Sequence, residues 1–159
     1  DHEDYIQKDA NQGSDSDIQF GYSVNLVNDD IIVGAPRAYS SSKERRNGCV
    51  YIFYRFFGGG YPTHEKIISD EVDMNTLNIT TGNFNFGLSV ASTSNLNKLW
   101  ILQNVPGQGT YVGEYEKVNG TYEMKNSSDM YKISNDNLLG YVEIGSDNQS
   151  VVYLSLIHI

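Results

Sequence analysis

A short pattern, Phe-Gly followed by residues that alternate between apolar and polar, recurs along the chain and constrains its fold more than any other feature. It is FGYSV at residues 20–24, FGLSV at 86–90 and, in a weaker form, LGYVE at 139–143. The pattern returns after intervals of comparable length, and such a return indicates an internal repeat.

Each copy of the pattern is followed by more short apolar runs. The second run is DIIVGAP, KLWILQNVP and SVVYLSL in the three copies. In the first two copies a third run opens at a glycine (GCVYIFYRF and GTYVGEYEK), and a fourth follows a turn that contains glycine. One such turn is Asn119-Gly120, a dipeptide that accepts the positive φ angles of a type I′ hairpin. We therefore predict four short antiparallel strands in each repeat.

The apolar residues keep a period of two, which is typical of strands, and no segment keeps a helical period over three turns. Period two is clearest in two sets of residues: Tyr22, Val24 and Leu26, and Val50, Ile52 and Tyr54. Repeated four-stranded sheets, each too small to bury its own faces, are the sequence signature of a β-propeller. We predict an all-β fold made of antiparallel propeller blades.

The repeat divides the chain into four parts. Residues 1–19 are predicted to be the last strand of a preceding blade and a connection, 20–85 a complete blade, 86–138 a second and degenerate blade, and 139–159 the start of a further blade. The last six residues, 154–159, resemble the translation of a transposon end used in sequencing libraries, so we expect them not to be native. We expect the whole chain to be a piece of a larger protein.

Charge and cysteine content exclude several classes of function. Acidic residues outnumber basic ones by 20 to 11, which gives a formal net charge of −9. A field of this sign repels phosphate backbones and anionic lipid surfaces, so we expect no nucleic-acid partner and no membrane insertion by this segment. Cys49 is the only cysteine; it alternates with apolar residues and is expected to be buried in a strand.

The motif residues resemble those of the FG-GAP repeat found in integrin α-subunit propellers and related surface proteins. The second unit departs from that pattern, because Asn104-Val105 stands where the family has Gly-Ala. The residues that carry the resemblance are Phe20, Gly21, Gly34, Ala35, Pro36 and Gly48 in the first unit, Phe86, Gly87, Pro106 and Gly109 in the second, and Gly140 in the third.

We interpret these motif residues as structural. A large apolar side chain at Phe20 or Phe86 can pack between adjacent sheets, and the glycine after it lets a neighbouring backbone come close. Pro36 and Pro106 end the second strand of their units because proline lacks a backbone donor.

Many repeats of this family hold calcium between their first two strands. The corresponding intervals here, NLVNDDII, ASTSNLNKLW and EIGSDNQSVV, contain at most two carboxylates each, fewer than calcium usually recruits. No catalytic constellation, nucleophile elbow or phosphate loop is recognisable either. We therefore predict no metal, no cofactor and no enzymatic activity.

The best candidate for a ligand site is the connection between the second and third strands of the first unit, residues 37–47. It gathers four of the chain's 11 basic residues on an otherwise acidic chain, and the resemblance to integrins places such loops on the ligand-facing rim. Arginine forks bind carboxylates or sulfated sugars, and tyrosine offers a flat contact. The alternative is a solvated loop without a partner. The candidate residues are Arg37, Tyr39, Lys43, Arg45 and Arg46.

The resemblance implies an extracellular or cell-surface protein that recognises a protein or glycan through rim loops, in contact with further blades of its own chain. Two alternatives stay open: an accessory propeller of a larger surface enzyme, and a repeat with a purely structural role. Four N-glycosylation sequons, at Asn78, Asn119, Asn126 and Asn148, are compatible with a glycoprotein.

Overall fold

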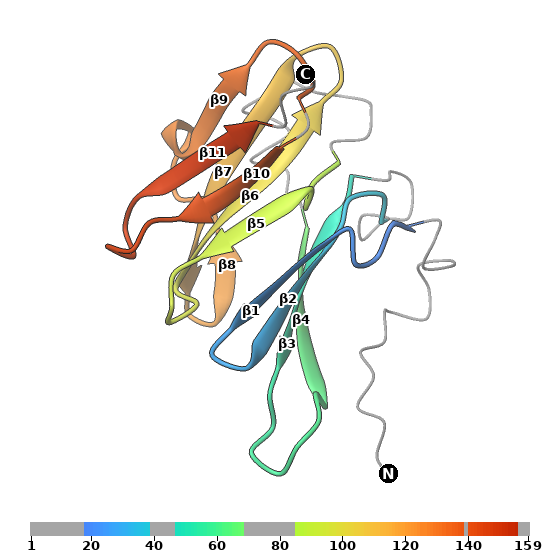
Figure 1. The fold of residues 1–159 in the computed structure, drawn as a ribbon, viewed down its shortest axis with the longest axis vertical. Helices are drawn as coiled ribbons and strands as arrows, with labels where there is room; N and C mark the ends of the chain where they lie inside the picture. The colour runs from blue at the N-terminus through green and yellow to red at the C-terminus, as the bar shows by residue number, and fades with distance from the viewer. Residues whose placement is uncertain (1–17, 39–46, 69–84, 139, 156–159) are drawn as a thin grey trace.

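The computed structural model describes residues 18–38, 47–68, 85–138 and 140–155. These residues form strands joined by turns, with one short 3-10 turn (Figure 1). The predicted all-β fold is confirmed.

The first sheet has four antiparallel strands in the order β1-β2-β3-β4. The turn between β1 and β2 consists of Asn28 and Asp29, whose φ angles of 50° and 70° suit the twist of a type I′ hairpin. β2 ends one residue before Pro36. The strands are β1 (Ser23–Val27), β2 (Asp30–Ala35), β3 (Cys49–Tyr54) and β4 (Thr63–Ile68).

The second sheet has five strands where four were predicted. β8 pairs with β7 at one end, and β9 pairs with the same edge of β7 at the other end. The strands are β5 (Ser89–Ser92), β6 (Lys98–Val105), β7 (Gly109–Val118), β8 (Thr121–Glu123) and β9 (Met130–Ser134).

The predicted fourth strand of this unit, TYEMKNS, stops early for a physical reason. Met124 is buried in the core, and the next residues turn through the 3-10 helix η1 (Ser127–Asp129). Within this turn the Asp129 carboxylate accepts a hydrogen bond from the Asn126 backbone N–H at 3.0 Å. The chain then rejoins β7, which at ten residues is long enough to pair with both short strands.

The third sheet consists of β10 (Gly140–Ile144) and β11 (Val151–Ser155), an antiparallel hairpin that packs beside β5. Figure 1 shows the two strands lying over the second sheet, on the side away from the first sheet. The described sheets resemble successive propeller blades, and they do not close into a ring.

Alternation along β3 explains how a single strand is buried on both faces. Val50 and Ile52 belong to the core between the first and second sheets, together with Phe86 and Leu99. Cys49, Tyr51 and Phe53 belong to a separate cluster on the opposite face of the first sheet. A third cluster, around Trp100, Leu102 and Val142, joins the second sheet to the β10–β11 hairpin.

Candidate functional site

The strand connections lie at two opposite ends of the sheets, which we call rims after their places in Figure 1. Contacts between turns define the lower rim: the Arg55 N–H donates to Asp30 Oδ1 at 2.7 Å, and the Lys117 N–H donates to the Asn97 carbonyl at 2.8 Å. The lower rim contains turns 28–29, 55–62, 93–97 and 119–120, and the upper rim contains residues 36–38, 47–48 and 106–108.

Several glycines of the repeat motif lie where the first sheet meets the second. A Cβ at Gly87 would come within 2.7 Å of the Cys49 carbonyl oxygen, and one at Gly34 would collide with the Gly87 carbonyl. Gly48 has a φ of +93° and forms a parallel bridge with Phe86. A Cβ at Gly48 would collide with the backbone of Phe86. The two backbones can approach this closely only because these positions lack side chains.

The remaining motif residues shape the strands and the core. Phe86 is fully buried, with its ring edge-on to Tyr115 at 5.6 Å between centroids. Phe20 is half-buried and lies edge-on to Tyr51 at 5.4 Å. In both units, therefore, the motif phenylalanine packs against an aromatic residue in the third strand of its own sheet. Other motif positions are Gly21, which has a positive φ, Ala35 and Pro36 at the end of β2, Pro106 after β6, and Gly109 and Gly140 at the starts of β7 and β10.

Of the predicted ligand residues, the described structure includes only Arg37, on the upper rim. Its side chain is exposed, and its backbone N–H donates to the Ile18 carbonyl at 3.2 Å. The other four, Tyr39, Lys43, Arg45 and Arg46, lie outside the described residues. The basic loop therefore stays a prediction.

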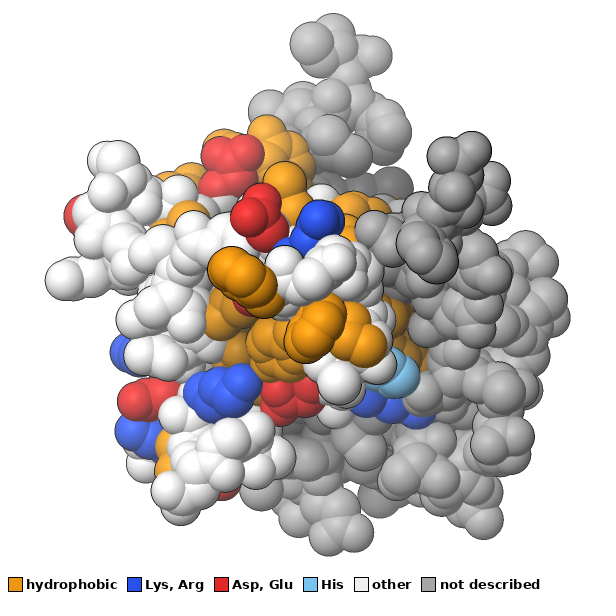
Figure 2. Space-filling view, turned by 90° about the horizontal axis from the view of Figure 1, so that it is seen from below, with side chains coloured by type: hydrophobic (Ala, Val, Ile, Leu, Met, Phe, Trp, Pro, Cys, Tyr) orange, Lys and Arg blue, Asp and Glu red, His pale blue; other side chains and the backbone are white. Residues whose placement is uncertain are grey.

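The lower rim presents a group of aromatic residues that the sequence patterns did not single out. We call Phe56, Phe57 and Tyr61, all in the connection between β3 and β4, the aromatic tip. The Phe57 side chain is fully exposed, and that of Phe56 is 59% exposed. Figure 2 views the molecule from this side and shows hydrophobic side chains gathered at the centre of the described surface, with charged groups around them.

The backbone of the aromatic tip is held by hydrogen bonds. The Phe56 N–H donates to the Gly60 carbonyl at 3.0 Å, and the Tyr61 hydroxyl donates to the Asp29 carbonyl at 3.0 Å. The Arg55 guanidinium lies over the Tyr61 ring, 5.6 Å from its centroid. The turn thus has a defined shape, and it presents the two phenylalanine rings to solvent. A sequence signal could have identified the aromatic tip. Phe56 and Phe57 are consecutive aromatic residues that break the alternation just before a run of glycines.

A polar cluster beside the aromatic tip joins the first two sheets. Lys117 on β7 donates to the Tyr54 hydroxyl at 3.0 Å, and that hydroxyl donates to Glu65 Oε2 at 2.7 Å. The Lys117 ammonium also lies over the Tyr54 and Tyr122 rings. Burial, followed by the nearby Glu65 carboxylate, raises the pKa of the Tyr54 hydroxyl, so this group stays protonated and donates. The cluster therefore stabilises the contact between the sheets.

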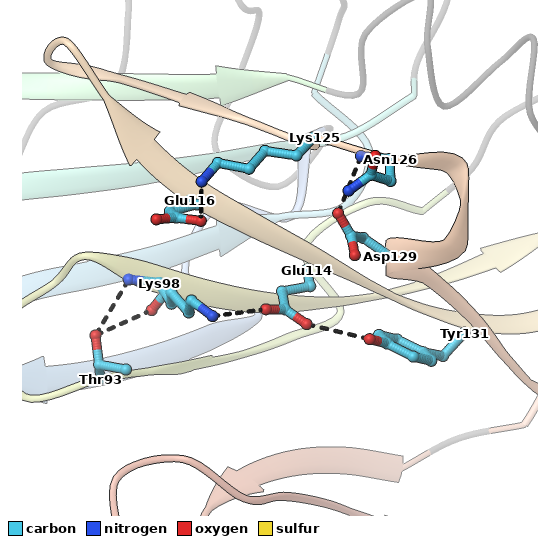
Figure 3. Close-up of polar contacts among 8 residues, drawn as sticks. All are labelled: Thr93, Lys98, Glu114, Glu116, Lys125, Asn126, Asp129 and Tyr131. Carbon is cyan, nitrogen blue, oxygen red and sulfur yellow. Dashed lines mark hydrogen bonds and ion pairs between the residues drawn. The ribbon is translucent and has the colours of Figure 1, made fainter.

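A groove of about 800 Å³ separates the second sheet from the β10–β11 hairpin. On one wall Glu114 is held through both oxygens, by Lys98 Nζ at 3.1 Å and by the Tyr131 hydroxyl at 3.2 Å (Figure 3). The hydrogen bond to Glu114 is the main reason that the pKa of Lys98 is raised. Trp100 and Tyr153 also line the groove. The polar groups on this wall are thus paired with one another.

Within the four described ranges, no group of His, Cys, Asp and Glu side chains is arranged to hold a metal ion. The same ranges contain no helix that is long and apolar enough to cross a membrane. Cys49, the only cysteine of the sequence, is buried in β3.

The all-β fold and its four-stranded antiparallel sheet are consistent with the blades of a β-propeller. Residues 9–53 match the family model of the FG-GAP repeat. The matched range contains Phe20-Gly21, Gly34-Ala35-Pro36 and nearly all of β3, so this segment of the chain is similar to an FG-GAP repeat. No curated protein matches the chain.

Proposed function

We propose that this chain is a non-catalytic part of an integrin-type β-propeller, located at the cell surface or outside the cell, that recognises a protein or glycan partner through its rim loops. The observation that supports the proposal best is the aromatic tip. Exposing two adjacent phenylalanine rings to water is unfavourable, and each ring would contribute about 2 kcal/mol if a partner buried it fully.

The composition of the aromatic tip also suits recognition. Apolar patches surrounded by polar groups mark interaction sites, and aromatic residues and arginine are enriched in protein interfaces. Arg55, stacked on Tyr61, adds a charged group beside the rings. Because hydrogen bonds already hold the loop backbone, binding would cost little additional conformational entropy.

The test is a binding screen of the 159-residue chain against a glycan array and a panel of purified extracellular-matrix proteins. Phe57→Ser tests the lower rim and Arg37→Glu tests the upper rim; both side chains are exposed, so neither change should alter folding. We expect binding to at least one probe, with Phe57→Ser weakening it tenfold or more and Arg37→Glu leaving it unchanged. Loss of binding only in Arg37→Glu would move the site to the basic loop. Absence of binding to every probe, or binding that neither change weakens, would contradict the proposal.

A further inference from the structure

We propose that, when the chain passes through a secretory compartment, Asn119 and Asn126 carry N-linked glycans and Asn148 does not. All three asparagines occupy sequons, Asn119-Gly-Thr, Asn126-Ser-Ser and Asn148-Gln-Ser. Asn126 and Asn148 share the Asn-x-Ser form, so they are the matched pair for comparing the structural surroundings of two sequons. The remaining sequon, at Asn78, lies outside the described residues.

Asn119 is accessible because it forms the first residue of the turn between β7 and β8. Its φ of 51° and the φ of 86° at Gly120 define a type I′ hairpin. The residue is exposed, and its side-chain amide makes no hydrogen bond to any described residue. Thr121, the third residue of the sequon, is also exposed. A glycan on Asn119 would project into solvent without disturbing the hairpin.

Asn126 is accessible for a different reason. It lies in the connection between β8 and β9, where its backbone forms two hydrogen bonds with Asp129. The Asn126 N–H donates to the Asp129 carboxylate, and the Asn126 carbonyl accepts from the Asp129 N–H at 3.0 Å (Figure 3). Asn126 takes part in both bonds through main-chain atoms only, and the residue is exposed. Attaching a sugar to the side-chain amide would leave both hydrogen bonds intact.

Asn148, in contrast, uses its side chain to hold two turns together. Its Oδ1 accepts a hydrogen bond from the Ser94 N–H at 2.9 Å, and its Nδ2 donates to Ser94 Oγ at 3.3 Å. These bonds connect the β10–β11 turn to the β5–β6 turn, and Asn148 also lines the groove between the two sheets. A sugar on Nδ2 would occupy the position of Ser94. A glycan at this sequon is therefore incompatible with the contact between the two turns.

The two accessible sequons lie on either side of an open strand edge. β8 pairs only with β7 among the described strands, so its other edge has unpaired backbone groups that attract further strands. Asn119 lies just before β8 and Asn126 just after it. Bulky hydrophilic sugars at both ends would keep a second chain from pairing with this edge.

The test is site-resolved glycan mapping of the chain secreted from a eukaryotic cell line behind an added leader. Peptides are deglycosylated enzymatically in heavy-oxygen water and analysed by mass spectrometry, which reports the occupancy of each asparagine. We expect most copies to carry a glycan at Asn119 and at Asn126, and almost none at Asn148. Substantial occupancy of Asn148, or little at either of the other two, would overturn the assignment.

Two variants test the shielding role separately. Asn119→Gln with Asn126→Gln should keep the circular dichroism spectrum of the parent but shift the chain towards dimers or larger species in size-exclusion chromatography. Asn148→Gln, the matched control, should leave the glycan mass unchanged. A double variant that stays as monomeric as the parent would show that the glycans do not protect the edge. None of these measurements involves a binding partner, so their failure is distinguishable from a failure of the proposed recognition role.

Discussion

Lys117 Nζ lies 3.4 Å from Glu65 Oε2, and this contact joins β7 of the second sheet to β4 of the first. The two residues are 52 positions apart in the sequence. Both side chains are mostly shielded from solvent, with 29% and 21% of their surfaces exposed. Tyr54 takes part in the same contact, since it bonds to both charged groups. The ion pair therefore belongs to the contact between two successive blades.

Replacing Lys117 with methionine should destabilise the chain by about 1 to 2 kcal/mol, because a shielded carboxylate loses its cation. Lys125→Met is the matched control. Its ion pair with Glu116 lies at the surface, with exposures of 48% and 36%, and such pairs contribute about 0 to 1 kcal/mol. Urea unfolding of both variants measures the difference. Equal losses would mean that the Lys117 pair does not support the contact between sheets.

Alanine at Gly87 should destabilise the chain by about 2 kcal/mol or more, because overpacking adds to the strain of a positive φ. Its φ is +96°, and its new Cβ would press on the Cys49 carbonyl. Gly107→Ala is the control, because Gly107 also has a positive φ but faces open space. It should lose only about 1 kcal/mol. Similar unfolding midpoints for the two variants in urea would argue against the close approach of the sheets.

Most of the fold could be predicted from local signals in the sequence. Alternation and turn residues such as Asn119-Gly120 specify strands through side-chain direction and backbone φ, and both are local properties. The arrangement in which the predicted fourth strand ends early, at Glu123, and a separate strand β9 pairs with β7 could not be foreseen. It depends on the burial of Met124 and on the length of β7, which are properties of the assembled sheet.

The candidate site was harder to predict than the fold. The exposure of Phe57 depends on where the loop projects, and a pair of phenylalanines is more often part of a core. The role of Asn148 is equally hidden in the sequence, because its partner Ser94 is 54 residues away. Contacts between distant turns follow from the packing of whole sheets, which no single segment specifies.

Phe86→Ala should cost about 3 to 5 kcal/mol, the usual cost of removing a fully buried phenylalanine. Phe20→Ala should cost less, because Phe20 is only half-buried in the described structure. Chemical unfolding of both variants provides the comparison. If Phe20→Ala destabilises the chain as much as Phe86→Ala does, the two motif positions are equally important. In that case the burial of each phenylalanine does not determine how much free energy of unfolding is lost.

Acid should loosen the β10–β11 hairpin before the rest of the protein, because Asp147 holds its turn. Hydrogen bonds from the Ser150 side chain, and then from the backbone N–H groups of Ser150 and Gln149, lower the pKa of the Asp147 carboxyl from 3.8 to about 2. The depressed pKa means that the stabilisation is fully present above pH 3.8 and is lost as the pH falls through about 2.

Trp100, the only tryptophan in the chain, packs against this hairpin, so its fluorescence reports the change. Its emission should shift to longer wavelength as the pH falls through this range. In Asp147→Ala the shifted emission should already be present at neutral pH, because the turn lacks its carboxylate at every pH. An acid transition of equal size in both proteins would contradict a role for Asp147 in the turn.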